Sequence, residues 1–498
     1  MKKMVLLLVL MACSVGWTAT KYCSPAGAGT HAGTVGNEYT LPEAKIGAGV
    51  GDTVYMAAGT YTLAANLSIT SSTTWIPQGN VIIDCDNTYT FDLSNNNPTT
   101  GPGGIIFGDS TYTYTITVTK SAGAGLGLAN DARSSRATLY NIIATANALN
   151  GICGYDGYNA AFNLEVICHQ CKSYANLNDG FSLIGAGTAP TNGADILYLD
   201  NCEGYSNGNA DNDQGFTAHS PYHRVYAIGG SYHDNTGPGA EIVTGAVAVC
   251  DNVLFYNNGT STASQIVLGA TAGTSFIATR CKFYGPFAGT YCADLSGIGI
   301  QKFTDCEFIG TATAEALIHV GASATAAIFD RCIFRDLTTA NKYAISVEST
   351  NVTGFLSLRN CVFNNNTCIL TSAQRTIEMV NNIFSNNISS IGINLASQYG
   401  YPYLYGLTGY NDFYNNGNDF YQTGAGFSAV KQSTDLAVNP QFVDAANGDF
   451  RLLPSSPLLN AGVSVSGKGK NTIGTWQPYS TPNPNNPRNR YSNENIYK

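Results

Sequence analysis

The chain has 498 residues, of which only 11% are charged, and its formal net charge is −9 at pH 7. An acidic chain without clustered Lys and Arg is poorly suited to neutralising phosphates, which argues against nucleic acid as a partner. The 54 Gly and 30 Tyr, together with the scarcity of charges, are typical of an extracellular all-β protein.

The N-terminus carries an export signal. Two lysines precede the apolar run 4–12, which is too short to cross a membrane, and small residues follow through Ala19. Residues 1–19 are therefore predicted to be a signal peptide, and the mature protein to be secreted or held at a bacterial cell surface. Two processing routes stay open: ordinary cleavage after Ala19, which we favour, and lipid attachment at Cys13, because residues 10–13 resemble a bacterial lipoprotein box. No later stretch is long and apolar enough for a transmembrane helix.

Residues 20–65 are predicted to form an N-terminal cap and the first coil. Residues 41–45 suit a short helix, and residues 51–62 place a turn before an apolar strand and a Gly turn after it. A cap is expected because the open end of a stack of strands exposes unpaired backbone groups that recruit other chains.

A short phrase recurs through the second half of the chain: a Cys or Asn, then one variable residue, then Phe. Its copies begin at Cys281, Cys306, Cys332, Cys361, Asn382 and Asn411. They lie 25, 26, 29, 21 and 29 residues apart, and fainter copies begin at Cys171, Cys202 and Gly229. This period predicts a solenoid whose turns each place one small residue at an inward bend.

Between the copies, the chain consists of short β-branched or alternating segments bounded by Gly, Asn and Asp. Four of them are residues 194–199, 224–228, 354–358 and 376–380. They are predicted to be strands, and amphipathic helical runs are nearly absent. The pattern predicts an all-β, single-stranded parallel β-helix of about ten or more coils over residues 66–476. Neighbouring coils would stack about 4.8 Å apart and align equivalent side chains in columns inside the tube.

The cysteines fit the same pattern. Fourteen Cys in an exported protein would ordinarily indicate disulfides. Six of them fall at the repeating position, where stacking of small buried thiols explains their spacing. We therefore expect at most one or two disulfides, between thiols on adjacent coils.

Further motifs stand near the C-terminus. Residues 439–444 read Asn-Pro-Gln-Phe-Val-Asp, and two more short motifs follow at 448–452 and 454–462. Together with residues 51–62, they resemble the segments that bracket secreted right-handed parallel β-helix proteins of the pectate-lyase-like superfamily. The resemblance implies a right-handed β-helix but no single activity, because this architecture hosts lyases, hydrolases, epimerases and adhesins. The Pro- and Asn-rich residues 477–498 are expected to be a disordered tail.

Chemistry is expected on the coils between residues 150 and 267, which hold four of the six His. Superimposing these coils on their Gly-aromatic steps places Phe181, Phe216 and Ala240 inward. The predicted outward column contains Ser182, Thr217, Glu241 and Gln265, and the next outward position holds Ile184, His219, Val243 and Val267. On this register, His219 and Glu241 lie on adjacent coils within side-chain reach. A carboxylate beside an imidazole raises the pKa of the ring and orients it as a general base.

The resemblance to the pectate-lyase-like superfamily implies, together with this pair, a polysaccharide lyase that acts on an acidic polysaccharide by β-elimination. The base that removes the proton next to the uronate carboxyl group would be His219, with His223 and Lys172 as alternatives, and Arg224 plus a cation would supply positive charge. Residues 215–219 also resemble the Gly-Phe-Asp-Pro-His element of alginate epimerases, but Thr217 stands where the catalytic Asp would be, so that mechanism is not expected.

Three carboxylates form a predicted metal site. Asp179, Asp211 and Asp213 lie on neighbouring coils and are expected to bind Ca²⁺, which takes six to eight oxygen ligands. Such an ion would also bridge an acidic protein to a uronate. Hydrolysis is the close alternative to elimination, since Asp179, Asp213 and Glu241 would also supply the two carboxylates of a glycoside hydrolase. For all of these side chains the competing interpretation is that they are solvated turn residues.

A tyrosine strip gives an independent hint. Tyr399, Tyr401, Tyr403 and Tyr405 alternate, so in an extended segment all four would face one side and form a flat surface for sugar rings. The alternative is that these rings cover a loop against the helix. A second class of function therefore stays open: a non-catalytic cell-surface or adhesive protein that binds glycans.

Overall fold

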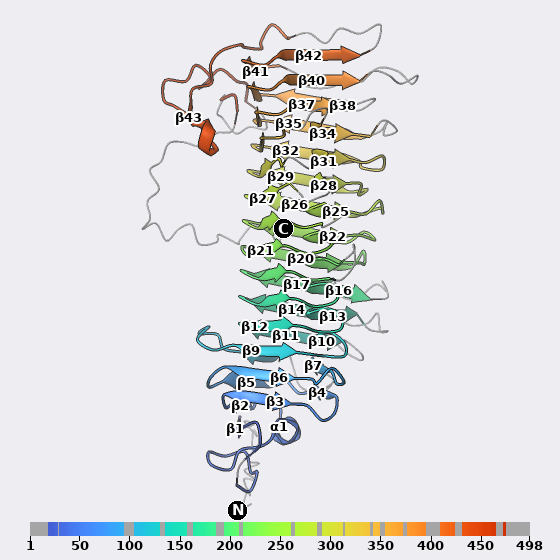
Figure 1. Cartoon of the computed structure of the whole chain (residues 1–498), viewed down its shortest axis with the longest axis vertical. Coiled ribbons are helices and arrows are strands. Elements are labelled where there is room, and N and C mark those ends of the chain that lie inside the picture. The colour runs from blue at the N-terminus through green and yellow to red at the C-terminus, as the bar shows by residue number, and fades with distance from the viewer. Residues whose placement is uncertain are drawn as a thin grey trace, which may run out of the picture. The chain divides into compact units, whose positions relative to one another are not determined.

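The computed structural model describes residues 18–27, 29–93, 104–129, 135–156, 163–185, 194–208, 213–259, 264–285, 291–311, 314–338, 342–348, 354–371, 376–394, 409–423, 431–464 and 472–474. The chain divides into two compact units, Met1–Gln301 and Lys302–Lys498. Both consist of short strands in stacked coils (Figure 1). Within the described part of the chain, no helix is long and apolar enough to cross a membrane.

In the first unit, each successive coil adds one strand to each of three parallel sheets. The first sheet contains β1 (Thr20–Cys23), β2 (Thr53–Met56), β5 (Thr74–Pro77), β8 (Ile105–Gly108), β11 (Ser135–Tyr140), β14 (Leu164–His169), β17 (Asp195–Asp200), β20 (His223–Ile228), β23 (Val247–Asp251) and β26 (Ser275–Thr279). The second contains β4 (Leu67–Ile69), β7 (Phe91–Leu93), β10 (Leu126–Ala129), β13 (Ile152–Asp156), β16 (Phe181–Gly185), β19 (Phe216–Ala218), β22 (Ala240–Ile242), β25 (Ile266–Leu268) and β28 (Tyr291–Leu295). The third contains β3 (Gly59–Thr62), β6 (Val81–Asp84), β9 (Ile116–Thr119), β12 (Ile142–Thr145), β15 (Lys172–Tyr174), β18 (Glu203–Tyr205), β21 (Ser231–His233), β24 (Leu254–Tyr256) and β27 (Lys282–Tyr284).

The second unit repeats this plan. Its strands are β32 (Ala326–Asp330), β35 (Phe355–Arg359) and β38 (Thr376–Val380) in one sheet, β31 (Ala316–Val320), β34 (Tyr343–Val347), β37 (Cys368–Thr371), β40 (Ser389–Asn394) and β42 (Asn418–Thr423) in another, and β30 (Glu307–Ile309), β33 (Ile333–Arg335), β36 (Val362–Asn364), β39 (Ile383–Ser385) and β41 (Asp412–Tyr414) in the third. Strand β29 (Ile300–Thr304) includes the division between the units. The predicted all-β parallel β-helix is confirmed, and the four segments predicted as strands lie within one residue of β17, β20, β35 and β38.

The N-terminal segment contains the expected short helix, α1 (Leu41–Gly47). The Glu43 carboxylate accepts hydrogen bonds from the backbone N–H of Thr40 at 2.8 Å and from the Thr40 hydroxyl at 2.7 Å, which closes the first turn. Strand β1 pairs with β2 in parallel register, so the chain joins the first sheet from Thr20 onward. Cys13 and the rest of residues 1–17 lie outside the described residues, as does the tail 477–498.

The predicted columns of Cys and Phe are present. In the second unit, the rings of Phe308, Phe334, Phe363, Phe384 and Phe413 stack in sequence with centroids 5.0, 4.6, 5.1 and 4.9 Å apart. The six cysteines at the repeating position are buried, and the twelve cysteines whose side chains the structure describes are free thiols. The Cys361 thiol donates to the Phe329 carbonyl one coil back at 3.5 Å, and the Asn382 amide makes the equivalent bond to the Leu358 carbonyl at 2.9 Å. A buried thiol and a buried amide therefore make the same hydrogen bond at equivalent bends.

The bends depend on left-handed backbone at the residue before each inward side chain. This residue has a φ of 51° at Asn201, 53° at Asn360 and 58° at Asn381. The left-handed region costs a non-glycine residue about 1–2 kcal/mol, least for Asn and Asp, which explains the many Asn at the corners.

A ladder of buried asparagines follows a second corner of the first unit. Its members are Asn147, Asn176, Asn207, Asn235 and Asn258, each donating its amide to the side-chain oxygen of the next at 2.7–3.0 Å. The ladder ends where Asn258 donates to Gln265 at 2.7 Å. In the second unit, two shorter ladders end on carboxylates, with Asn411 donating to Asp435 and Asn416 to Asp419. These ladders satisfy the backbone polar groups of the buried corners.

The C-terminal segment packs on the outside of the second unit. Strands β43 (Phe442–Asp444) and β44 (Asp449–Leu452) pair antiparallel on either side of the 3-10 turn η1 (Ala445–Asn447). Phe450, Leu452 and Leu458 form a buried cluster with Val362 of β36 and Ile383 of β39. Apolar burial therefore fixes this segment against the third sheet.

Candidate functional site

Three neighbouring coils of the first unit bring the main candidate residues together. Strands β16, β19 and β22 pair in parallel, with Ser182 beside Thr217 and Thr217 beside Glu241. His219 follows β19 directly and reaches diagonally to the next coil, where its Nε2 lies 3.2 Å from Oε2 of Glu241. The predicted contact between His219 and Glu241 is thus confirmed, whereas its catalytic role stays a prediction.

The His219–Glu241 pair is only partly covered. The imidazole is 40% exposed and the carboxylate 24% exposed, so both are open to a bound molecule. The hydrogen bond that the His219 ring donates to the Glu241 carboxylate raises the pKa of His219 above its ordinary value, and partial burial opposes this effect. The ring therefore carries a proton over a wider pH range than a free histidine does.

Asp179 adds a buried carboxyl group to the same electrostatic neighbourhood. It stands two residues before β16, is only 8% exposed, and accepts a hydrogen bond from the backbone N–H of Gln214 at 3.0 Å. Burial raises its pKa to about 7, and the nearby charge of Glu241 acts in the same direction, while His219 opposes it. The Asp179 carboxyl group therefore keeps its proton to a much higher pH than an exposed aspartate does.

The predicted register fails on one coil. The structure pairs Glu241 with Val267 and not with Gln265, and Gly269 takes the place next to Val243 that Val267 was expected to occupy. Gln265 is fully buried and accepts from Asn258 inside the core, so its predicted outward position was wrong. Ser182 and Thr217 keep the predicted register with Glu241, but they too are fully buried. This coil has neither the glycine nor the aromatic residue on which the superposition depended.

Two other predicted residues sit on β20. His223 is fully buried, and burial lowers its pKa to about 4. Its Nε2 lies 3.8 Å from Oδ2 of Asp195, and it offers no surface to a polymer. Arg224 Nη1 donates to the backbone oxygens of Pro221 at 2.9 Å and His223 at 2.8 Å. Among the described residues it makes no contact with the His219–Glu241 pair.

Only part of the predicted calcium site lies among the described residues. Asp211 lies outside the described residues, and among those described no group of three or more His, Cys, Asp or Glu side chains is placed to hold a metal ion. Asp179 and Asp213 have the hard oxygen donors that Ca²⁺ prefers, but two carboxylates fall short of six to eight ligands. The metal site stays a prediction that depends on Asp211.

The tyrosines predicted to bind sugar, Tyr399, Tyr401, Tyr403 and Tyr405, also lie outside the described residues. A different aromatic column occurs on the outer face of the third sheet, where Tyr174, Tyr205, His233 and Tyr256 stack at 4.8, 5.0 and 4.3 Å. The sequence signal for it is an aromatic three or four residues after the inward bend, repeated on successive coils. Because these rings cover one another's faces, they present mainly edges to solvent.

No family model matches the chain, and no curated protein matches its sequence. Solved structures that it resembles include the A-module of the mannuronan C-5 epimerase AlgE4 from Azotobacter vinelandii, with 14% identity, a TM-score of 0.37, and coverage of 65% of this chain and 90% of that one. Pectate lyase Pel9A is 13% identical with a TM-score of 0.33, covering 92% and 96%. A mannuronic acid-specific polysaccharide family 6 lyase from human gut microbiota is 11% identical with a TM-score of 0.27, covering 82% and 83%. With all three TM-scores below 0.5, these similarities do not define the activity of this chain.

Proposed function

We propose that this protein is a carbohydrate-active enzyme, a polysaccharide lyase that cleaves an acidic polysaccharide by β-elimination. The observation that carries the proposal is the exposed His219–Glu241 pair with the buried acid Asp179 beside it. The signal-like N-terminus supports action outside the cell, either in free form or attached through Cys13.

In this mechanism, neutral His219 removes the proton next to the uronate carboxyl group. Glu241 orients the ring and stabilises the imidazolium that forms. The electron pair of the broken C–H bond becomes the new C=C double bond. The bond to the leaving sugar breaks with its electrons on the departing oxygen, and protonated Asp179 supplies a proton to that oxygen. Ca²⁺, if held by Asp179, Asp211 and Asp213, would supply positive charge against the enolate-like intermediate. Because a metal ligand must be ionised, Asp179 cannot both bind the metal and donate this proton.

Hydrolysis is the second candidate. Asp179 and Glu241 have different environments, because Asp179 is buried and has a raised pKa, whereas Glu241 is paired with an imidazole. A glycoside hydrolase needs one carboxyl group as the acid and a second as the base or nucleophile. Two carboxyl groups in such different environments are suited to these separate roles. The two reactions give different products, because elimination leaves an unsaturated sugar that absorbs ultraviolet light and hydrolysis leaves a saturated one.

The test is incubation of the purified chain with a panel of polyuronates, with and without chelator, while ultraviolet absorbance and reducing ends are both followed. A rise in both supports elimination, and reducing ends alone support hydrolysis. Silence in both assays would contradict the enzyme proposal. Loss of activity with chelator would support the metal role, whereas full activity in chelator would support the acid role of Asp179.

A further inference from the structure

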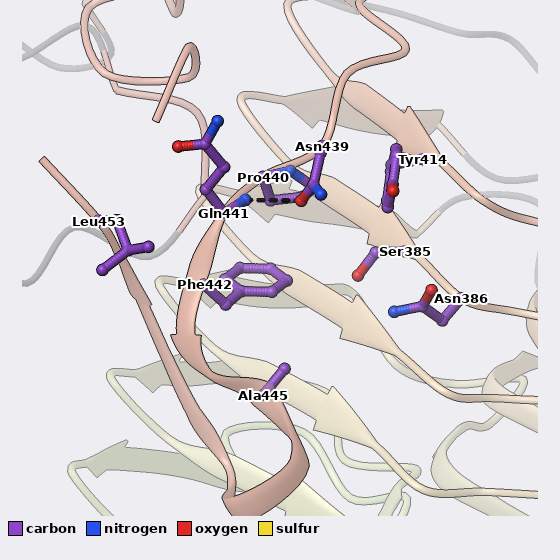
Figure 2. Close-up of a pocket in the computed structure, with 9 residues that line it drawn as sticks. All are labelled: Ser385, Asn386, Tyr414, Asn439, Pro440, Gln441, Phe442, Ala445 and Leu453. Carbon is purple, nitrogen blue, oxygen red and sulfur yellow. Dashed lines mark hydrogen bonds between the residues drawn. The ribbon is translucent and has the colours of Figure 1, made fainter. Parts of the chain in front are cut away.

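A separate cavity lies in the second unit, between the outer face of β39 and β41 and the chain that leads into β43 (Figure 2). Its volume of about 420 Å³ falls within the range of roughly 300–1,000 Å³ that is typical of small-molecule sites. The side chains that define its chemistry are those of Tyr414, Phe442, Ser385, Asn386 and Asn439. None of the described residues that line it is charged.

The walls of this cavity are held in place from behind. Ser385 and Tyr414 are neighbours in the register of β39 and β41. On the other wall, Phe442 packs edge to face on Phe450 with centroids 5.1 Å apart, and Phe450 belongs to the buried cluster on the third sheet. The Ser456 hydroxyl donates to the Pro440 carbonyl at 2.6 Å. The cavity is therefore formed before any ligand arrives, which lowers the entropic cost of binding.

Two side-chain amides, those of Asn386 and Asn439, present the same chemical group to this cavity, whereas the Gln441 side chain points away from the wall formed by Ser385 and Tyr414 (Figure 2). Their oxygens are already occupied, because Asn386 accepts from Asn415 at 2.8 Å and Asn439 from the backbone N–H of Gln441 at 2.9 Å. Their NH₂ groups have no hydrogen-bond partner among the described residues. An amide fixed by its oxygen keeps its donors aimed in one direction, so the cavity offers several uncharged N–H donors.

We propose that this cavity binds an uncharged sugar residue of an oligosaccharide. Sugar oxygens accept hydrogen bonds from the amide donors, and the Tyr414 ring, which stacks on no other ring among the described residues, offers a face to the C–H side of the sugar. Figure 2 shows Tyr414 on the sheet side and Phe442 on the side of the C-terminal segment. The lining has no cation to compensate a carboxylate in a chain of net charge −9, which disfavours uronates here. The site is thus distinct from the proposed lyase site in residues and in ligand charge.

The test is isothermal titration of the full chain with neutral tetrasaccharides built from glucose, mannose, galactose or xylose, and with tetragalacturonate for comparison. At least one neutral tetrasaccharide is expected to bind, with an affinity that changes little between low and high salt. Tyr414→Ala is expected to weaken that binding at least tenfold, and Asn439→Ala severalfold. Tyr256→Ala, which removes a partly exposed tyrosine of the first unit, is the matched control and should bind as the parent does.

Three results would overturn the proposal: no neutral tetrasaccharide binds, tetragalacturonate alone binds, or neither variant changes the affinity. Circular dichroism and the melting temperature show whether Tyr414→Ala still folds, and Asn439→Ala keeps the test open if it does not. His219→Ala should bind the neutral sugar normally. Failure of the lyase proposal and failure of this one are therefore distinguishable.

Discussion

The asparagine ladder of the first unit predicts that a single substitution, Asn207→Ala, causes a large loss of stability. Asn207 is fully buried, donates to the Ser173 carbonyl and to Asn235 at 3.0 Å each, and accepts from the side chain of Asn176 at 3.0 Å. It also accepts from the backbone N–H of Asn176 at 3.4 Å. Asn207→Ala removes all four bonds and leaves two backbone groups without these partners in the core.

The size of the effect follows from these contacts. A buried polar group that loses its partner costs about 1–3 kcal/mol, and a lost hydrogen bond between side chains about 1 kcal/mol net. Asn207→Ala is therefore expected to lower the free energy of unfolding by roughly 3–5 kcal/mol. Asn178→Ala is the matched control, because Asn178 is close in sequence and its side chain makes no hydrogen bond among the described residues. We expect that control to cost less than about 0.5 kcal/mol.

Two measurements check this prediction. Urea unfolding gives the change in free energy, and hydrogen exchange gives the local effect, since the Asn176 amide loses its acceptor and should exchange faster. Local exchange matters because the coils of a solenoid contact mainly their neighbours and can open separately. If Asn207→Ala and Asn178→Ala unfold alike, or if the Asn176 amide keeps its protection, the ladder does not stabilise the fold as described.

The remaining predictions concern titratable groups of the first unit. His219→Ala should lower activity on the polyuronate at least a hundredfold with little change in melting temperature, whereas His169→Ala, which breaks another histidine–carboxylate contact on the first sheet, should keep activity. Equal activity of the two variants would remove His219 from the mechanism. Glu241→Gln should move the acid limb of the kcat/KM profile to lower pH, because Glu241 raises the pKa of His219 and the base must be neutral; an unmoved limb would contradict this. His223 has a pKa of about 4 in the folded protein, below its ordinary value. The unfolded chain therefore binds more protons than the folded chain between about pH 6.5 and 4. As the pH falls through this window, the free energy of unfolding decreases by about 3 kcal/mol. The raised pKa of Asp179 changes the stability in the opposite direction over the same window. The test is therefore the difference in unfolding free energy between the parent and His223→Gln, measured across the window. A difference that does not change with pH would refute the prediction.

The inward columns could be predicted because the coils repeat one short phrase, in which a small residue is followed two residues later by an aromatic residue. The same logic placed His219 next to Glu241, since Phe216 and Ala240 both follow a glycine. It failed at Gln265, where that marker is missing and a buried amide takes its place.

The burial of His223 was missed although its signal is present in the sequence. His223, Val225 and Ala227 alternate along β20, and period two puts His223 on the same inward face as the two apolar residues. The raised pKa of Asp179 had no such signal, because it depends on how deeply the carboxyl group is buried and on charges brought in from other coils.

The direction of the asparagine ladders sets where they can stop. Each amide passes its N–H to the next coil and receives one from the coil before, so the donors of a ladder all point the same way along the axis. A residue that only accepts terminates such a series without an unused donor. In the second unit Asp419 and Asp435 occupy those terminal places, and their negative charge faces the positive end of an aligned row of dipoles. A duplicated coil inserted before either aspartate would keep all donors of the ladder pointing the same way. A coil added beyond the aspartate could not extend the ladder, because the carboxylate has no N–H to donate to it.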